Sequence, residues 1–110
     1  MIIHYPPIIL AELTKRAQNP IADAPDLKKH LIVNQTQTEF ILLLLGWDKK
    51  RYTHSVLYHI ELRENKVWVH EDNTSVGIAA VLAEKGIPKL EIVLGYLPWY
   101  EREASEYGLG

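Results

Sequence analysis

The stretch YTHSVLYHIELRENKVWVHE, Tyr52 to Glu71, decides the fold that this sequence predicts. Apolar and polar residues alternate on both sides of Glu64-Asn65, and these two residues suit a two-residue loop between antiparallel strands. In the resulting register His59 lies directly opposite His70. One face of the hairpin then forms a predicted core, made of Val56, Tyr58, Ile60, Leu62, Val67 and Val69.

The opposite face of the predicted hairpin is too apolar for a surface left fully in water. The preceding strand, Glu39 to Trp47, is apolar at nearly every position, so we predict that it is buried on both faces and that alternate side chains join this second face. Either an N-terminal helix and the aromatic C-terminal tail cover the second face, or a partner does, and the shortness of the helix favours a partner. The predicted partner or dimer interface comprises Phe40, Leu42, Leu44, Leu57, Trp68, Trp99 and Tyr100.

The remaining segments complete a predicted α+β fold with one domain, residues 1–110. Apolar residues at helical spacing predict an amphipathic helix from Ile8 to Gln18, and a further strand ends at Val33. After the hairpin, Thr74 is the predicted N-cap of a helix from Ser75 to Lys85, and a short helical turn follows over Lys89 to Leu94. The sequence therefore predicts a four-stranded antiparallel β-meander with an N-terminal helix and C-terminal helices packed on it.

Composition excludes several classes of function. The 110 residues carry a net charge of −2, which gives no overall attraction to nucleic acid or anionic lipid. The chain has no cysteine, which excludes disulfides, thiolate zinc sites and cysteine nucleophiles. The first residues lack the pattern of a secretory signal, and the longest apolar run, Phe40 to Leu45, is far shorter than the ~20 residues that span a bilayer. We expect a soluble cytoplasmic protein without membrane contact.

Two histidines and neighbouring acids raise the question of a reaction centre. His59 and His70 could share a metal ion with Glu61 or Asp72 as a third ligand, but packed histidine pairs have the same spacing and no pattern of supporting residues is recognisable. Glu71 and Asp72 are adjacent in a strand and point to opposite faces, so they do not converge as paired acids. Asp72 instead suits a helix start. We predict no metal, no cofactor, no catalytic residues and no enzymatic activity.

A basic hairpin tip is the strongest local signal for nucleic acid. Lys49, Lys50 and Arg51, together with His54, place basic groups beside Trp47, whose ring can stack on a base. Charged hairpin tips are also common solvated turns, and no basic field surrounds this one. Direct DNA contact through these four polar residues therefore stays an alternative interpretation.

A series of short motifs runs in order from Leu42 to Pro98, over about half of the chain. Its residues include Gly46, Trp47, Asp48, Trp68, Asp72, Gly77, Gly86, Pro88 and Gly95. With these motifs the segment resembles the XisI family, described as controlling factors for excision of the fdxN DNA element in cyanobacteria. The chain departs from the family pattern at Ser75, where the family usually has an acid, and at Trp99, where it has a second proline.

The resemblance implies an α+β domain that assembles as a homodimer. It also implies participation in the programmed excision of a DNA element, together with a companion protein, XisH, and a separate site-specific recombinase. The family has no established catalytic residues. The resemblance therefore predicts a non-enzymatic controlling factor that binds an XisH-like partner and associates with DNA weakly or indirectly. The alternative is an accessory factor that binds DNA directly through residues 49–51.

Overall fold

The predicted hairpin forms the centre of the structure, a computed structural model that describes residues 4–21, 23–74 and 77–110. Strand β3 (Arg51–Arg63) turns into β4 (Lys66–Asp72) through Glu64 and Asn65. The φ angles of these two residues, 54° and 62°, are the positive values that a type I′ turn requires. Arg63 pairs with Lys66 across the turn, so the predicted two-residue loop is confirmed.

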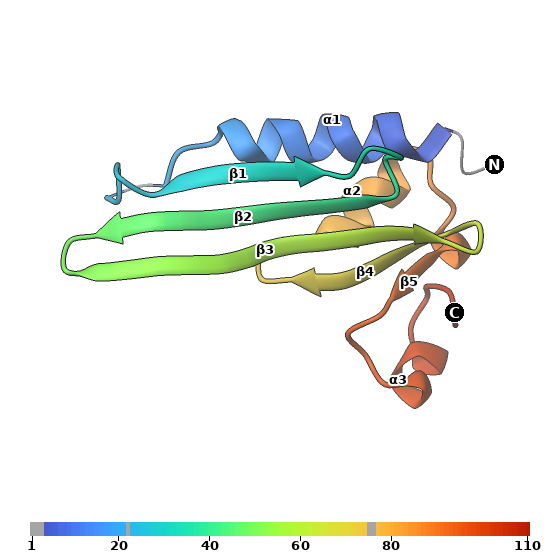
Figure 1. Cartoon of the computed structure of the whole chain (residues 1–110). Helices are drawn as coiled ribbons and strands as arrows, with labels where there is room; N and C mark the ends of the chain where they lie inside the picture. Colours follow the sequence, from blue (N-terminus) through green and yellow to red (C-terminus); the bar gives the residue numbers. More distant parts are fainter. Residues whose placement is uncertain (1–3, 22, 75–76) are drawn as a thin grey trace.

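The sheet has five strands in the order β1-β2-β3-β4-β5 (Figure 1). Strands β1 (Lys28–Val33) and β2 (Glu39–Asp48) precede the hairpin, and the first four strands are antiparallel, as predicted. The prediction lacks β5 (Ile92–Leu94), which pairs parallel with β4 and makes the sheet mixed. Where a helical turn is predicted over Lys89 to Leu94, only η2 (Lys89–Glu91) is helical. A three-residue strand is too short for an alternating pattern to reveal it.

Two helices, α1 (Tyr5–Gln18) and α2 (Ile78–Glu84), lie on the same side of the sheet (Figure 1). Both contribute to one hydrophobic core, whose fully buried members include Ile9, Leu13, Phe40, Leu42, Ile60, Val67, Val69, Ile78 and Leu82. The other side of the sheet carries neither of these helices, and we call it the open face. No helix in the described part of the chain is both long and apolar enough to cross a bilayer.

A β-bulge in β3 corrects the predicted register between β2 and β3. Leu43 pairs with Val56, but Leu42 pairs with Tyr58, so Leu57 is an extra residue in β3. A slip of one residue exchanges the two faces of a strand. Beyond the bulge, Leu42 therefore shares the core face with Tyr58, whereas Val56, predicted in the core, is half-buried on the open face. The placement of Phe40 and Leu42 on the second face is wrong, because both are fully buried in the core.

A second bulge changes the predicted histidine pairing. Ile60 pairs with Val69 as predicted, but His59 pairs with Glu71, so His70 is the extra residue of β4. The prediction that His59 and His70 are directly opposed is therefore wrong. Their imidazole rings are still neighbours, with 5.0 Å between centroids.

Helix α2 begins later than predicted, and Asp72 supplies its cap. Asp72 ends β4, and its Oδ2 accepts a hydrogen bond of 2.7 Å from the backbone N–H of Ile78, the first helical residue. Its Oδ1 accepts a second bond of 2.7 Å from the Thr74 hydroxyl. The N-cap predicted at Thr74 is wrong, since Gly77 is the residue before the helix. The predicted start, Ser75, lies outside the described residues.

The C-terminal tail closes the β5 edge of the sheet. Val93 is fully buried and bridges to Gly108, whose N–H donates to the Ile92 carbonyl. Arg102, in α3 (Trp99–Ala104), donates to the carbonyls of Leu97 and Leu109. These bonds fix the tail against the edge that would otherwise remain unpaired.

Candidate interaction surface

The open face carries an apolar ladder across three adjacent antiparallel strands, β1, β2 and β3. Residues that face one another on paired strands share a side of the sheet, so the register places these side chains together. The first row is Ile32 beside Ile41, and the next is Leu43 beside Val56. Further along lie Leu45 and then Trp47 beside Tyr52. The apolar ladder consists of Ile32, Ile41, Leu43, Leu45, Val56, Trp47 and Tyr52, and none of these side chains is fully buried.

The residues predicted for an interface do not form a single surface. Leu44 pairs with Ser55 on the core side of β2, and Leu57 is half-buried against the core. Trp68 lies on the open face, opposite Glu61. Trp99 and Tyr100 are exposed on α3, where their rings form a T-shaped pair 5.8 Å apart. The odd-numbered residues of β2 were missed because all of positions 40–45 are apolar, so either face fits the pattern.

Two arginines, Arg63 of β3 and Arg102 of the C-terminal tail, lie close to the Trp68 ring. The Arg63 guanidinium lies 4.0 Å from the centroid of the indole, and the Arg102 guanidinium lies 5.5 Å from it. Cations over an indole ring are stabilising. The indole Nε1 is buried and has no hydrogen-bond partner in the described part of the structure. The tail thus covers the β4 end of the open face, while no described helix covers the apolar ladder.

Two histidine–glutamate pairs lie between the apolar ladder and Trp68. His59 Nε2 is 2.9 Å from Glu39 Oε1, and His70 Nε2 is 2.7 Å from Glu61 Oε1. Each imidazole is directed at its own carboxylate, so the two histidines and their neighbours do not converge on one point. No group of three or more potential metal ligands occurs within residues 4–21, 23–74 and 77–110.

The basic hairpin tip stands at the far end of the same face (Figure 1). Lys49 and Lys50 form the turn between β2 and β3, and Asp48 pairs with Arg51 beside it. Next to this turn, the Trp47 and Tyr52 rings lie 5.2 Å apart with an interplanar angle of 60°. The structure therefore brings the predicted tip residues together and adds Tyr52, which no sequence motif singles out.

Basic residues from β1 divide between the two sides of the sheet. Lys28 and His54 flank Leu45 in one row, so both belong to the open face near the tip. Lys29 faces the helix side, where its Nζ donates to the Arg16 carbonyl over 3.0 Å. Burial, followed by the nearby guanidinium of Arg16, lowers the pKa of Lys29.

Buried polar contacts under α1 are structural. Glu12 is buried and forms a 2.8 Å ion pair with Arg16, whose guanidinium also donates to the Tyr58 hydroxyl. Burial opposes the charge of Arg16, but the hydrogen bond to Glu12 and the contact with Tyr58 outweigh it and raise the pKa of Arg16. These contacts fix α1 to the sheet and occupy Glu12, Arg16 and Tyr58 with one another.

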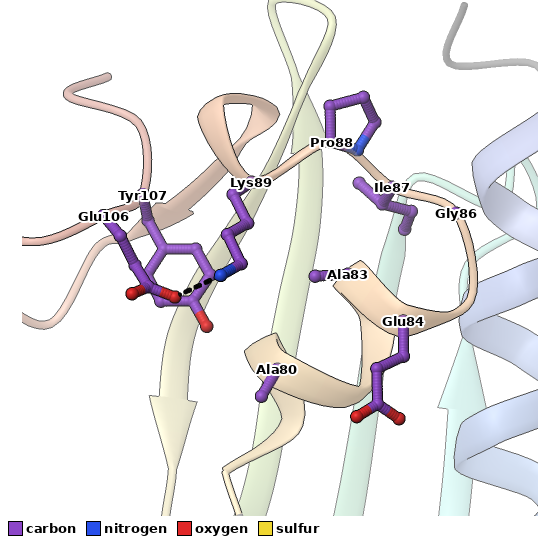
Figure 2. Close-up of a pocket in the computed structure, with 9 residues that line it drawn as sticks. All are labelled: Ala80, Ala83, Glu84, Gly86, Ile87, Pro88, Lys89, Glu106 and Tyr107. Atoms are coloured by element: carbon purple, nitrogen blue, oxygen red, sulfur yellow. Dashed lines mark hydrogen bonds and ion pairs between the residues drawn. The ribbon is translucent and has the colours of Figure 1, made fainter.

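Several motif residues have structural roles at the other end of the molecule. Gly86 and Pro88 line a cavity of about 420 Å³ between α2 and the tail. An ion pair of 2.6 Å between Lys89 and Glu106 borders this cavity on the side of the tail (Figure 2). A Cβ added to Gly95 would lie 3.2 Å from His70 Nδ1, so this glycine permits close packing of the chain after β5. The other residues that line the cavity between α2 and the tail are Ala80, Ala83, Glu84, Ile87 and Tyr107.

The chain is similar to proteins of one family in both sequence and fold. Residues 1–109 match the family model described as XisI protein. A crystal structure of an XisI-like protein from Anabaena variabilis is 23% identical, with a TM-score of 0.90 and complete coverage of both chains. A crystal structure of the fdxN element excision controlling factor XisI from the same species is 24% identical, with a TM-score of 0.80, and the match covers 99% of this chain and 98% of that one. A search of curated protein sequences finds no match.

Proposed function

Because the chain belongs to the XisI protein family, we propose that it is an accessory factor in the programmed excision of a DNA element of the fdxN type. In this proposal the protein acts by binding a partner protein and has no catalytic step of its own. The partner is an XisH-like protein, and the chain also associates with a second copy of itself. The family membership supports the process, and the open face supports the mode of action.

The observation that carries the binding role is the uncovered apolar ladder. Soluble proteins rarely leave a continuous apolar patch of several hundred Å² in water unless something binds there. The accessible surface is 6972 Å² for a mass of 12.7 kDa, whereas a compact monomer of that mass exposes about 6,200 Å². The larger surface fits an elongated molecule with a protruding hairpin. The apolar ladder that this shape leaves uncovered supports a role in partner binding.

The polar groups beside the apolar ladder fit the rim of such an interface. In the pairs His59–Glu39 and His70–Glu61 each imidazole Nε2 is hydrogen-bonded to a carboxylate oxygen, so a partner can cover these atoms without leaving them unbonded. Trp68, whose indole has two guanidinium groups within 5.5 Å of its centroid, borders the surface at its β4 end.

The proposal of a protein without a catalytic step is supported by the contacts that the carboxylates of Asp72 and Glu71 make. The carboxylate of Asp72 accepts bonds from Ile78 and Thr74, and it lies on the core side, opposite Tyr58. Glu71 faces the other way and accepts from Asn73. The two acids therefore do not share a site, which supports a role in binding.

Co-expression with an XisH-like protein, followed by light scattering, tests the proposal. In Leu43→Glu a carboxylate replaces a central apolar side chain of the open face, and we expect the complex and the homodimer to weaken by at least about tenfold. Leu90→Glu is the matched control, because Leu90 is exposed on η2, outside the apolar ladder. A wild-type protein that stays monomeric and does not bind the XisH-like protein would show that the proposal is wrong, as would equal effects of the two variants.

A further inference from the structure

The hairpin tip combines exposed aromatic rings with positive charge. Trp47 is 57% exposed and Tyr52 is 51% exposed, although both belong to a sheet. They are direct cross-strand partners on the open face, and their rings are 5.2 Å apart. Aromatic side chains of this size usually lose most of their surface on folding. A pair left in water on a protruding hairpin therefore offers two ring faces to a flat ligand.

Positive charge lies beside this aromatic pair. Lys49 and Lys50 lie beyond it in the turn, and Lys28 on β1 lies in the next row of the open face, beside Leu45. Arg51 also belongs to the tip, but it pairs with Asp48 and alternates with Tyr52, so its side chain starts from the other face. None of these four side chains forms an ion pair with another residue in the described part of the chain. Their charges are therefore available to a ligand, and Asp48 is the nearest carboxylate along the strand.

The charge of the whole chain is unevenly distributed. Residues 28–54 contain five lysines and arginines and two acids, a net charge of +3, while the rest of the chain carries −5. The overall charge of −2 therefore hides a basic end of the sheet. A local field of this kind can hold a polyanion even on an acidic protein, because screening limits the repulsion from distant charges to roughly 10 Å.

Stacking distinguishes a single strand from a duplex. Bases in a duplex are stacked on each other and hide their faces, whereas the bases of a single strand are free to stack on protein rings. Contacts to a duplex are made mostly to phosphate oxygens and to base edges in the grooves, where a ring has no exposed base face to stack on. A tip that presents an indole and a phenol beside lysines fits the single strand better.

We propose that the tip of the β2–β3 hairpin binds single-stranded nucleic acid. Trp47 and Tyr52 stack on adjacent bases, while Lys28, Lys49 and Lys50 contact the phosphates on either side. This role goes beyond the binding of a protein partner, although Trp47 and Tyr52 are also the last row of the apolar ladder. Leu43 lies further along β2, away from the tip, so Leu43→Glu should weaken the protein complex and leave oligonucleotide binding in place.

The chain contains a matched control for the aromatic pair. Trp99 and Tyr100 on α3 are 66% and 60% exposed, and their rings are 5.8 Å apart. The following segment is acidic, with Glu101, Glu103 and Glu106. A similar pair of rings in an acidic setting should not bind a polyanion.

The test is fluorescence anisotropy with labelled oligonucleotides of about 12 nucleotides at about 50 mM salt. We expect oligo(dT) to bind at least about tenfold more tightly than a duplex of the same length. An oligo(U) arm distinguishes a DNA ligand from an RNA ligand. The double variant Trp47→Ala/Tyr52→Ala should weaken single-strand binding by about tenfold or more, whereas Trp99→Ala/Tyr100→Ala should leave it unchanged.

A salt series separates stacking from charge. Replacing Lys49 and Lys50 by alanine should reduce the slope of log affinity against log salt by about one to two units, because fewer counterions are released. Equal affinity for duplex and single strand, or equal effects of the two aromatic double variants, would overturn the proposal. So would the absence of oligonucleotide binding, and loss of the protein complex in Trp47→Ala/Tyr52→Ala would then assign the tip to the partner surface.

Discussion

Gly46 occupies a position that a residue with a side chain cannot take without movement of the neighbouring loop. Its φ is +133°, and an added Cβ would lie 2.5 Å from the carbonyl oxygen of Asp26. The close approach holds the loop between α1 and β1 against the core side of β2. The glycine that belongs to the sequence motif therefore has a structural explanation at this residue.

We predict that Gly46→Ala lowers the free energy of unfolding by roughly 1–3 kcal/mol, through backbone strain and the clash with Asp26. Urea denaturation measures this loss. Gly86→Ala is the control, because Gly86 also has a positive φ, +116°, but an added Cβ meets no atom within 4 Å. The loss at Gly86 should be smaller, and equal losses would mean that the contact with Asp26 plays no part.

Tyr5 gives a prediction about alkaline pH. Its hydroxyl donates to the Glu91 carboxylate, and burial, together with this bond and the negative charge, raises the pKa of Tyr5 from 10.0 to about 12. The folded protein holds this proton more tightly than the unfolded chain does. The stability that the group contributes is therefore complete below pH 10 and is lost as the pH rises from 10 to about 12.

In Tyr5→Phe this part of the alkaline loss should disappear, so the stability curve between pH 10 and 12 becomes flatter than that of the wild type. Chemical denaturation at a series of pH values measures the difference. Tyr52→Phe serves as the comparison because Tyr52 is half exposed at the hairpin tip. If both variants flattened the stability curve between pH 10 and 12 by the same amount, the proposed effect of Glu91 on Tyr5 would be contradicted.

At the scale of secondary-structure elements, the four long strands could be predicted from alternation and turn residues. Glu64-Asn65 determined the register of the β3–β4 hairpin, and the predicted bounds of the strands lie within about two residues of those observed. The bulge at Leu57 could not be predicted, because apolar residues fill positions 40–45 and fit both registers equally well. That one extra residue moves Phe40 and Leu42 to the core and Val56 to the open face.

The start of α2 depends on a side chain from another element. Asp72→Ala removes the acceptor for the Ile78 N–H and for Thr74, so we predict a loss of about 1–2 kcal/mol in the free energy of unfolding. Thermal or urea denaturation measures it. Glu71→Ala is the matched control, since Glu71 is the exposed neighbour whose carboxylate accepts from Asn73. Equal losses of unfolding free energy in the two variants would show that Asp72 does not stabilise α2 as a cap.

At the scale of the whole molecule, the hairpin formed by β2 and β3 extends beyond the flanking strands β1 and β4 (Figure 1). Strand β4 ends opposite Tyr58, and Asn73 then donates to the carbonyls of Val56 and Leu57. Within the described residues no strand pairs with residues 51–55 of β3 on that side, and the molecule measures 42 × 29 × 22 Å. The candidate surfaces depend on this arrangement. The sequence predicted the basic residues of the tip, but not that Lys28 and Tyr52 join them, because that depends on how three strands align.

Hydrogen exchange should show a gradient along this hairpin. We predict the slowest exchange near Ile60 and Leu62, where β3 lies between two strands, and faster exchange toward residues 51–55, where it has one. Addition of oligo(dT) should slow exchange at the tip and leave α3 unchanged. Uniform protection along β3 would contradict this description of the hairpin.

The three tryptophans of this chain lie in three different settings: Trp47 at the tip, Trp68 beside two guanidinium groups, and Trp99 on α3. Indole emission depends on polarity and on nearby quenchers. Variants that keep one tryptophan and replace the other two with phenylalanine would therefore carry a built-in optical reporter for one region each. With such a set, occupancy of the tip, docking of the tail and events at the C-terminal helix could be followed separately, without attached dyes.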